Sequence, residues 1–212
     1  MKPRFLRGRR VPTPLVVREP VRTERLILRP YTAADLDDYA AIQSDEEVVR
    51  YMFWPLRDRR ESAKHLAKRR RQTRLEQSGD FVGLAIELPS TPSLNPRPES
   101  GRVIGDASLL LRSVGNRQAE IGWVLHPDFG GKGYATEASR AMLDLAFGRL
   151  GVHRVVAQLD ARNSASAAMA ERLGMRREAL FRHDMWFKGA WGDSLYYAIL
   201  DEEWAANPQS AR

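Results

Sequence analysis

The chain has 212 residues, 43% of them hydrophobic, and a formal net charge of +7. That length supports one domain of ordinary size around a sizeable core. The chain has no cysteine, which excludes disulfides, thiolate zinc sites and a cysteine nucleophile. Because no apolar run approaches the roughly 18 residues that a membrane span needs, we expect a soluble, cytoplasmic protein that does not enter the membrane.

Prolines mark two segments that we expect to lie outside regular structure. Four prolines interrupt residues 1–20, which are expected to form a basic arm, and four more in residues 89–100 predict a surface loop. Residues 21–206, which follow the arm, are expected to form one domain. Residues 207–212 are expected to form a short tail.

The periodicity of apolar residues predicts the order of elements within that domain. Alternation predicts strands, whereas recurrence every three or four residues predicts helices. Strands are expected over residues 24–29, 81–88, 102–113, 118–125, 153–160 and 193–200. Helices are expected over residues 33–43, in a short stretch after Ser44, over 61–77, from about 133 onward and over 164–173. This order predicts an α/β (α+β) fold with a mixed sheet of about six to seven strands and helices on both faces.

Positive charge is concentrated in two places. Residues 1–10 hold five basic and no acidic residues, and residues 57–74 hold nine basic residues against Asp58 and Glu61. Such segments attract polyanions such as RNA or phosphate-bearing cofactors. A solvated helix face with a frayed arm would give the same pattern, so both interpretations stay open.

A glycine-rich segment, GGKGYA at residues 130–135, separates the strand 118–125 from the helix that follows. Glycines let a ligand approach the backbone and permit the φ angles that turn successive amides toward one point. The first amides of a helix also lack intrahelical partners, and the helix dipole favours an anion there. The loop is therefore predicted to bind a phosphate group; a turn that only connects strand to helix is the alternative.

Two familiar nucleotide-binding loops do not match this segment. A P-loop needs GxxxxGK[ST], but Lys132 is followed by Gly133. A dinucleotide fingerprint that begins at Gly131 would need glycine or alanine where Thr136 stands. The four histidines lack metal-ligand spacing and no GxSxG elbow occurs, so neither a metal site nor a serine hydrolase is expected.

The segment GGKGYA resembles the coenzyme A loop, [QR]xxGx[GA], of the GNAT N-acetyltransferases. The flanking EIGWVLHPDFGGKGYATEA is similar to the branch that contains ribosomal-protein-alanine N-terminal acetyltransferases. The resemblance continues through TERLILRPYTAADL, NSASAAMAERLGM and WGDSLYYAILDEEW. It implies transfer of an acetyl group from acetyl-coenzyme A directly to a primary amine. One departure is Gly130 at the position of the usual Gln or Arg, which leaves the backbone amides in place.

The resemblance also implies how the cofactor binds. The family's sheet splays between the strand before the loop, here residues 118–125, and the strand after the following helix, here residues 153–160. The pantetheine arm of coenzyme A enters that gap, and its pyrophosphate lies on the loop amides. The residues expected to contact the cofactor are Leu125, Gly130, Gly131, Lys132, Gly133, Tyr134, Ala135, Thr136 and Asn163.

Acetyl transfer needs a base that deprotonates the amine and an acid that protonates the departing thiolate. Glu120 is the candidate base, because similar enzymes often carry a glutamate at this place; a solvated strand residue is the alternative. The family's acid is commonly a tyrosine, but the aligned residue is Ala170, so Ser166 is the candidate acid. Asn163 and Ser166 also suit a simple helix cap.

The acceptor is expected to be an α-amine at the N-terminus of a protein or peptide, of the ribosomal-protein type. With a pKa near 8, an α-amine is more often neutral at pH 7 than a lysine amine. The alternatives are a small-molecule amine (an antibiotic, polyamine or amino acid) and a non-catalytic module that senses coenzyme A or binds RNA. The loop over residues 51–56, with Trp54, is a candidate wall of the acceptor pocket. A monomer or homodimer is expected, with ribosome or RNA association through the arm and residues 57–74.

Overall fold

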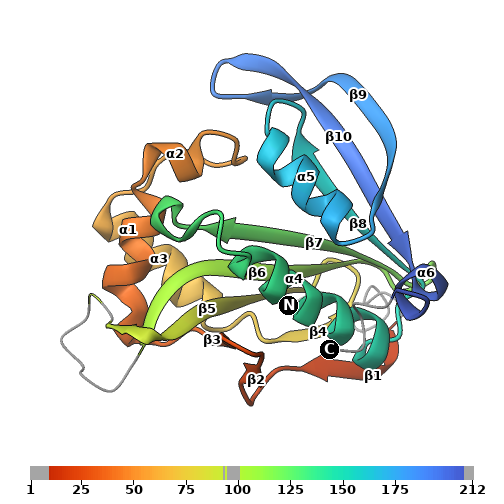
Figure 1. Ribbon diagram of the computed structural model, residues 1–212, viewed down its shortest axis with the longest axis horizontal. Coiled ribbons are helices and arrows are strands. Elements are labelled where there is room, and N and C mark those ends of the chain that lie inside the picture. Colours follow the sequence, from red (N-terminus) through yellow and green to blue (C-terminus); the bar gives the residue numbers. More distant parts are fainter. Residues whose placement is uncertain (1–9, 93, 95–100, 208–212) are drawn as a thin grey trace, which may run out of the picture.

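An eight-stranded sheet forms the centre of the computed structural model, which describes residues 10–92, 94 and 101–207 (Figure 1). Its strands are β2 (Val21–Arg22), β3 (Ile27–Pro30), β5 (Phe81–Pro92), β6 (Gly101–Ser113), β7 (Gln118–Leu125), β8 (Arg154–Asp160), β9 (Arg176–Phe187) and β10 (Ala190–Leu200). Their order in space is β2-β3-β5-β6-β7-β8-β10-β9, and every neighbouring pair is antiparallel except β7 and β8. The predicted mixed sheet is confirmed, with eight strands where the sequence predicted six to seven.

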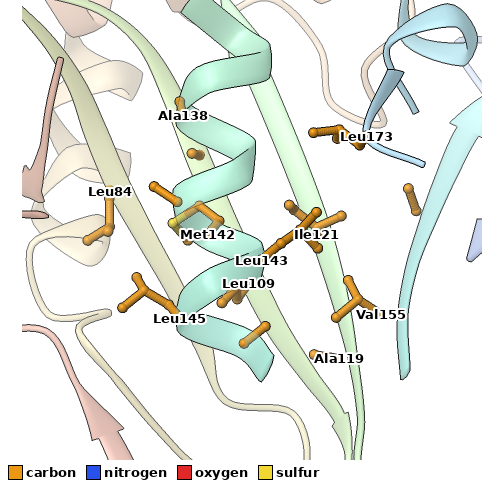
Figure 2. Packing of buried hydrophobic residues seen from close by; sticks show 14 of the residues in the cluster. Leu84, Leu109, Ala119, Ile121, Ala138, Met142, Leu143, Leu145, Val155 and Leu173 are labelled. Carbon is orange, nitrogen blue, oxygen red and sulfur yellow. The ribbon is translucent and has the colours of Figure 1, made fainter. Parts of the chain in front are cut away.

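Helices cover both faces of this sheet, as predicted (Figure 1). They are α1 (Leu36–Gln43), α2 (Glu46–Val49), α3 (Arg59–Arg69), α4 (Tyr134–Asp144), α5 (Ser164–Arg172) and α6 (Asp201–Ala205). Tyr39 of α1 and Leu66 of α3 share a buried cluster with Val124 of β7. Met142 of α4 packs on the opposite face, in the cluster that includes Ile121 of β7 (Figure 2). None of the helices in the described part of the chain is long and apolar enough to cross a membrane.

Helix α4 follows from the spacing of its apolar residues. The buried residues that recur at intervals of three and four are Ala138, Ala141, Met142 and Leu145. Small alanines let the helix approach the sheet closely, and Met142 and Leu143 fill the space beside Leu109 (Figure 2). The helix begins directly after Gly133 and passes into a π-type turn over Leu145–Arg149. Its first turn therefore borders the glycine loop that follows β7.

The charged segment for which the sequence predicted one helix over 61–77 contains two elements. Helix α3 begins after Asp58, whose carboxylate accepts a hydrogen bond from the Glu61 N–H at 2.7 Å, while Glu61 accepts one from the Asp58 N–H at 3.0 Å. The helix ends at Arg69, and strand β4 (Arg74–Gln77) follows. The helix prediction is wrong for this second part because Leu75 is fully buried and draws the strand into the core.

Part of the expected N-terminal arm is also a strand. Strand β1 (Arg10–Val16) pairs with β4 in a separate two-stranded sheet, and Leu15 is buried in the main core. Its prolines lie between Arg10 and Leu15, where the register shifts and the strand tolerates missing N–H donors. The arm prediction is therefore wrong for residues 10–16, and residues 1–9 lie outside the described residues.

The proline-rich loop is shorter than predicted at its first end. Strand β5 continues to Pro92, so residues 89–92 belong to the sheet. The rest of the predicted loop, residues 93 and 95–100, lies outside the described residues, as do residues 208–212 of the predicted tail.

Strands β7 and β8 lie side by side for only three residues each. Their parallel pairing runs from Gln118 opposite Arg154 to Glu120 opposite Val156. Beyond Glu120 the two strands separate (Figure 1), while β7 stays paired with β6 on its other side. The predicted splay between these strands is confirmed, and no strand of the described residues pairs with that edge of β7 over residues 121–125.

Candidate active site

The glycine loop adopts a backbone conformation that favours glycine at two positions. Gly131 and Gly133 have φ angles of 73° and 81°, in the left-handed region. The backbone N–H groups of Gly131, Gly133, Tyr134 and Ala135 meet no hydrogen-bond acceptor within the described part of the chain. Together with the positive end of the α4 dipole, these amides suit an anion.

A cleft of about 1450 Å³ opens beside this loop. The loop and α4 form one wall, and the turn between β2 and β3 contributes to the other. Six of the expected cofactor-binding residues line it, namely Leu125, Gly131, Gly133, Tyr134, Ala135 and Thr136. Five arginines, among them Arg25 and Arg140, outnumber three acidic residues in the lining. The excess of cations suits a ligand that carries phosphate groups.

Gly130 and Lys132 border the cleft without lining it. The Gly130 N–H donates to the carbonyl of Pro127 at 2.8 Å, and a Cβ at Gly130 would come within 3.1 Å of that oxygen. The close approach gives a physical reason for glycine where the family usually has Gln or Arg. The Lys132 ammonium donates to the carbonyl of Asp128 at 3.1 Å and lies 5.5 Å from the centre of the Phe129 ring. Its side chain thus folds back over the loop that precedes α4.

Glu120 is the last residue of β7 that pairs with β8, so it stands where the two strands separate. Its Oε2 lies 3.6 Å from Nη1 of Arg112 on β6. Burial raises the pKa of Glu120 above its ordinary value, and the charge of Arg112 opposes that rise only in part. A carboxylate with a raised pKa accepts a proton more readily near neutral pH. The side chain is 28% exposed and is therefore within reach of a ligand.

Asn163 and Ser166 begin helix α5 on the other side of the gap. The Oδ1 of Asn163 accepts a hydrogen bond from the Ser166 N–H at 3.0 Å, so the predicted helix cap is confirmed. The Oγ of Ser166 accepts a hydrogen bond from Nε1 of Trp123 on β7 at 3.3 Å. Since side chains alternate along a strand, Trp123 and Glu120 project from opposite faces of β7. Glu120 and Ser166 therefore flank the splay from opposite faces of the sheet.

Two other positions bear on the sequence predictions. Ala170, where the family commonly has a tyrosine, is fully buried, so the side chain offers neither a hydroxyl nor access to the gap. In the loop over residues 51–56, Trp54 packs against the buried cluster that contains Tyr39, Leu66 and Val124. Phe53, in contrast, contacts the ring of Phe187 at 6.3 Å between centres and lines a small cavity of about 140 Å³.

The turn between β2 and β3 adds residues that the sequence did not assign to the site. Thr23 and Arg25 both line the cleft and both hydrogen-bond to Glu137 in the first turn of α4. The motif TERLILRP carried part of the family resemblance, but the role of these residues becomes visible only once the fold brings them beside α4. No group of acidic and histidine residues in the described chain has the arrangement of a metal site.

A model of the acetyltransferase (GNAT) domain matches residues 25–176, which include the loop, both splayed strands and Glu120. The chain belongs to the GNAT acetyltransferase family. This GNAT protein is 41% identical to the uncharacterized N-acetyltransferase YnaD of Bacillus subtilis over 96 residues, which are 45% of this chain and 56% of that relative. The match with YnaD thus spans about half of its length.

Two further comparisons span nearly whole chains. The uncharacterized N-acetyltransferase p20 of Bacillus licheniformis is 28% identical over 192 residues, which cover 88% of this GNAT chain and 99% of p20. The crystal structure of a GNAT-family acetyltransferase from Bacillus anthracis superposes with a TM-score of 0.73 at 26% identity, over 87% of this chain and 99% of the other. These matches agree with the mixed, splayed sheet described above.

The geometry of the loop fits the co-substrate of the family, acetyl-coenzyme A. The free amides of Gly131, Gly133, Tyr134 and Ala135 offer donors for a diphosphate, and the cleft has room for the rest of a nucleotide. Acetyl-coenzyme A supplies the activated acyl group, so this GNAT protein is an acyltransferase that depends on it.

Proposed function

We propose that this GNAT protein transfers the acetyl group to the N-terminal α-amine of a protein or peptide, directly and within a ternary complex. The single observation that carries this proposal is the position of Glu120, a carboxylate with a raised pKa at the point where β7 and β8 separate. The open amides of the glycine loop lie at the end of the same strand and support a donor that runs along the gap.

In this proposal, Glu120 removes a proton from the acceptor's ammonium group, directly or through a water molecule. An α-amine with a pKa near 8 is already neutral in about one molecule in ten at pH 7, so it demands little of the base. The raised pKa of Glu120 narrows the remaining difference between base and amine. The positive charge of Arg112, 3.6 Å from Oε2, favours the ionised form of the carboxylate and offsets part of the effect of burial.

Ser166 is the proposed acid that hydrogen-bonds to or protonates the departing thiolate. Its Oγ accepts the indole N–H of Trp123, which leaves the hydroxyl hydrogen free to point toward another acceptor. The cap between Asn163 and the Ser166 N–H holds the first turn of α5 in place beside the gap. Asn163 is further proposed to contact the pantetheine.

Relatives of this chain are named for acceptors of two kinds. YdaF of Bacillus subtilis, 36% identical over 104 residues and 57% of its length, is described as a candidate ribosomal N-acetyltransferase. The spermidine N(1)-acetyltransferase of Escherichia coli is 24% identical over 91 residues and 49% of its length. The charge of α3 favours the first kind, because its exposed cations would repel a polycationic amine.

The exposed cations of α3 also support association with ribosomal RNA. Arg60, Lys64 and Lys68 of α3, and Arg71 just beyond its end, are exposed and form no ion pair within the described chain. Helix α3 covers the same face of the sheet that carries Glu120, as the cluster shared with Val124 indicates. Docking on RNA through these residues would bring a ribosomal protein terminus toward that face.

A thiol-release assay with acetyl-coenzyme A tests the proposal. Peptides with a free N-terminus are compared with the same peptides blocked by Nα-acetylation and with small amines such as spermidine. We expect release with free peptides, none with blocked peptides and little with spermidine. Thiol release with small amines alone would reject the peptide acceptor. No thiol release with any acceptor would favour a non-catalytic module.

A further inference from the structure

A carboxylate occupies the first turn of the helix that is expected to receive a diphosphate. Glu137 lies in that turn of α4, and its side chain is 15% exposed. Burial raises its pKa, but hydrogen bonds from Thr23 and Arg25 outweigh that effect and hold the pKa below its ordinary value. Glu137 therefore stays negatively charged beside an anion site, where a bare charge would oppose phosphate binding.

The carboxylate is fully engaged by the turn between β2 and β3. Its Oε1 accepts hydrogen bonds from Oγ1 of Thr23 at 2.6 Å and from the backbone N–H of Arg25 at 2.8 Å. Its Oε2 accepts a hydrogen bond from Nε of Arg25 at 2.7 Å. Segments more than a hundred positions apart in the sequence are thus joined at the start of α4.

Arg25 extends this connection into the glycine loop itself. Its Nη1 donates to the carbonyl of Lys132 at 2.9 Å, and its guanidinium carbon lies 4.6 Å from the centre of the Tyr134 ring. The two contacts fall on the residues that flank Gly133, whose φ is 81°. One side chain therefore holds both neighbours of a left-handed glycine that is otherwise free to adopt other conformations.

We propose that Thr23, Arg25 and Glu137 form a clamp that sets the glycine loop in its binding conformation before coenzyme A arrives. The inference rests on the family's use of this loop for coenzyme A. The clamp residues act as positioning residues: they fix the backbone whose amides bind the diphosphate, so the entropic cost of ordering the loop is met on folding rather than on binding. Arg25 at the same time neutralises Glu137.

A competing explanation makes Arg25 a direct ligand of the phosphates, with Glu137 a bystander. The two explanations predict opposite signs for Glu137→Gln. If charge alone matters, removal of a carboxylate from the anion site strengthens coenzyme A binding. If the clamp matters, the same change releases Arg25 and the loop and weakens binding. Glu24 provides a matched control, because it lines the same cleft and forms no hydrogen bond or ion pair within the described residues.

The experiment is a calorimetric titration of coenzyme A into the full-length protein and its variants, with steady-state kinetics alongside. Glu137→Gln is expected to raise the Kd of coenzyme A and the KM for acetyl-coenzyme A about tenfold, the effect of losing one hydrogen bond to a charged group. The KM for the acceptor is expected to stay the same, which a general loss of structure would not allow. Glu24→Gln is expected to bind coenzyme A at least as tightly as the parent.

Two further variants keep the test sharp. Arg25→Lys retains the charge but cannot reach the Glu137 carboxylate and the Lys132 carbonyl together, so it is expected to weaken binding nearly as much as Glu137→Gln. Thr23→Val alters no charge and is expected to weaken it a few-fold. Unchanged or tighter binding by Glu137→Gln, or parent-like binding by Arg25→Lys, overturns the clamp. No binding by the parent protein overturns the coenzyme A site as well.

Discussion

Replacing Gly133 by alanine tests whether the loop conformation is needed for coenzyme A. The residue has a φ of 81°, and a Cβ there would lie 3.4 Å from Nη2 of Arg25, an ordinary contact. Space is therefore no obstacle, and the whole effect comes from the left-handed backbone. For a residue with a Cβ, that conformation costs about 1–2 kcal/mol.

The free energy is lost in one of two ways. If the loop keeps its shape, the free energy of unfolding of the variant is about 1–2 kcal/mol lower than that of the parent. If the loop relaxes to another shape, the protein keeps its stability and the Kd of coenzyme A rises by roughly 5–30-fold. Chemical denaturation measures the loss of unfolding free energy, and calorimetric titration of the same sample measures the loss of binding free energy. The sum of the two losses is expected to match the roughly 1–2 kcal/mol that the left-handed conformation costs.

Gly148 is the control, because its φ is not in the left-handed region and a Cβ there meets nothing within 4 Å. Gly148 lies in the π-type turn over Leu145–Arg149 that follows α4. Gly148→Ala is expected to leave coenzyme A binding unchanged and to raise the free energy of unfolding by up to about 1 kcal/mol. A Gly133→Ala protein that loses neither stability nor affinity would show that the left-handed glycine is not required for coenzyme A binding.

Three further predictions concern the proposed chemistry and partner. Glu120→Gln is expected to lower kcat by about 10²–10⁴-fold with an unchanged Kd for coenzyme A. Because burial raises the pKa of Glu120, kcat of the parent protein should fall as the pH drops through a pKa above the ordinary 4.5. The variant should lose this decrease at low pH. A decrease that persists in the variant rejects Glu120 as the base. Ser166→Ala retains the backbone N–H that bonds to Asn163, so it is expected to slow transfer with little change in thermal stability; a loss of stability with normal transfer supports a capping role alone. Lys64→Gln with Lys68→Gln is expected to flatten the salt dependence of ribosomal RNA binding by about 1.4 in log–log slope, as two lost phosphate contacts on single strands imply; filter binding with an unchanged slope contradicts RNA docking through α3.

The elements around the loop could be predicted from the sequence because local patterns determine them. Strand β7 has the predicted bounds, and α4 begins directly after Gly133, close to the predicted start, since alternation ends and helical spacing begins within a few residues. Gly131 and Gly133 adopt left-handed φ angles, as expected for glycines in a tight loop, because glycine permits this conformation. The loop was therefore within reach of sequence patterns, whereas the splay was expected only from the family resemblance, and the roles of Glu120 and Ser166 stay predictions.

The elements that the sequence did not reveal depend on contacts from distant segments. Strand β4 follows a run of charged residues and contains Leu75 as its only apolar residue, so no alternation indicated a strand and the helix was extended through it. Strand β9 is an edge strand with mostly exposed residues, and it lacks the buried alternation by which strands are predicted. The Arg25–Glu137 pair joins residues 112 positions apart, and only the packing of the β2–β3 turn on α4 brings them together.

Binding of coenzyme A by this protein depends above all on contacts between the amides of the glycine loop and the diphosphate. The most direct test of these contacts is the amide NMR spectrum of the ¹⁵N-labelled protein during titration with coenzyme A. We expect large downfield shifts for the Gly131 and Gly133 N–H protons, whose bonds to solvent give way to charge-assisted ones, and no change for Gly115 in the turn between β6 and β7. Saturable binding that leaves the Gly131 and Gly133 signals in place would contradict this expectation.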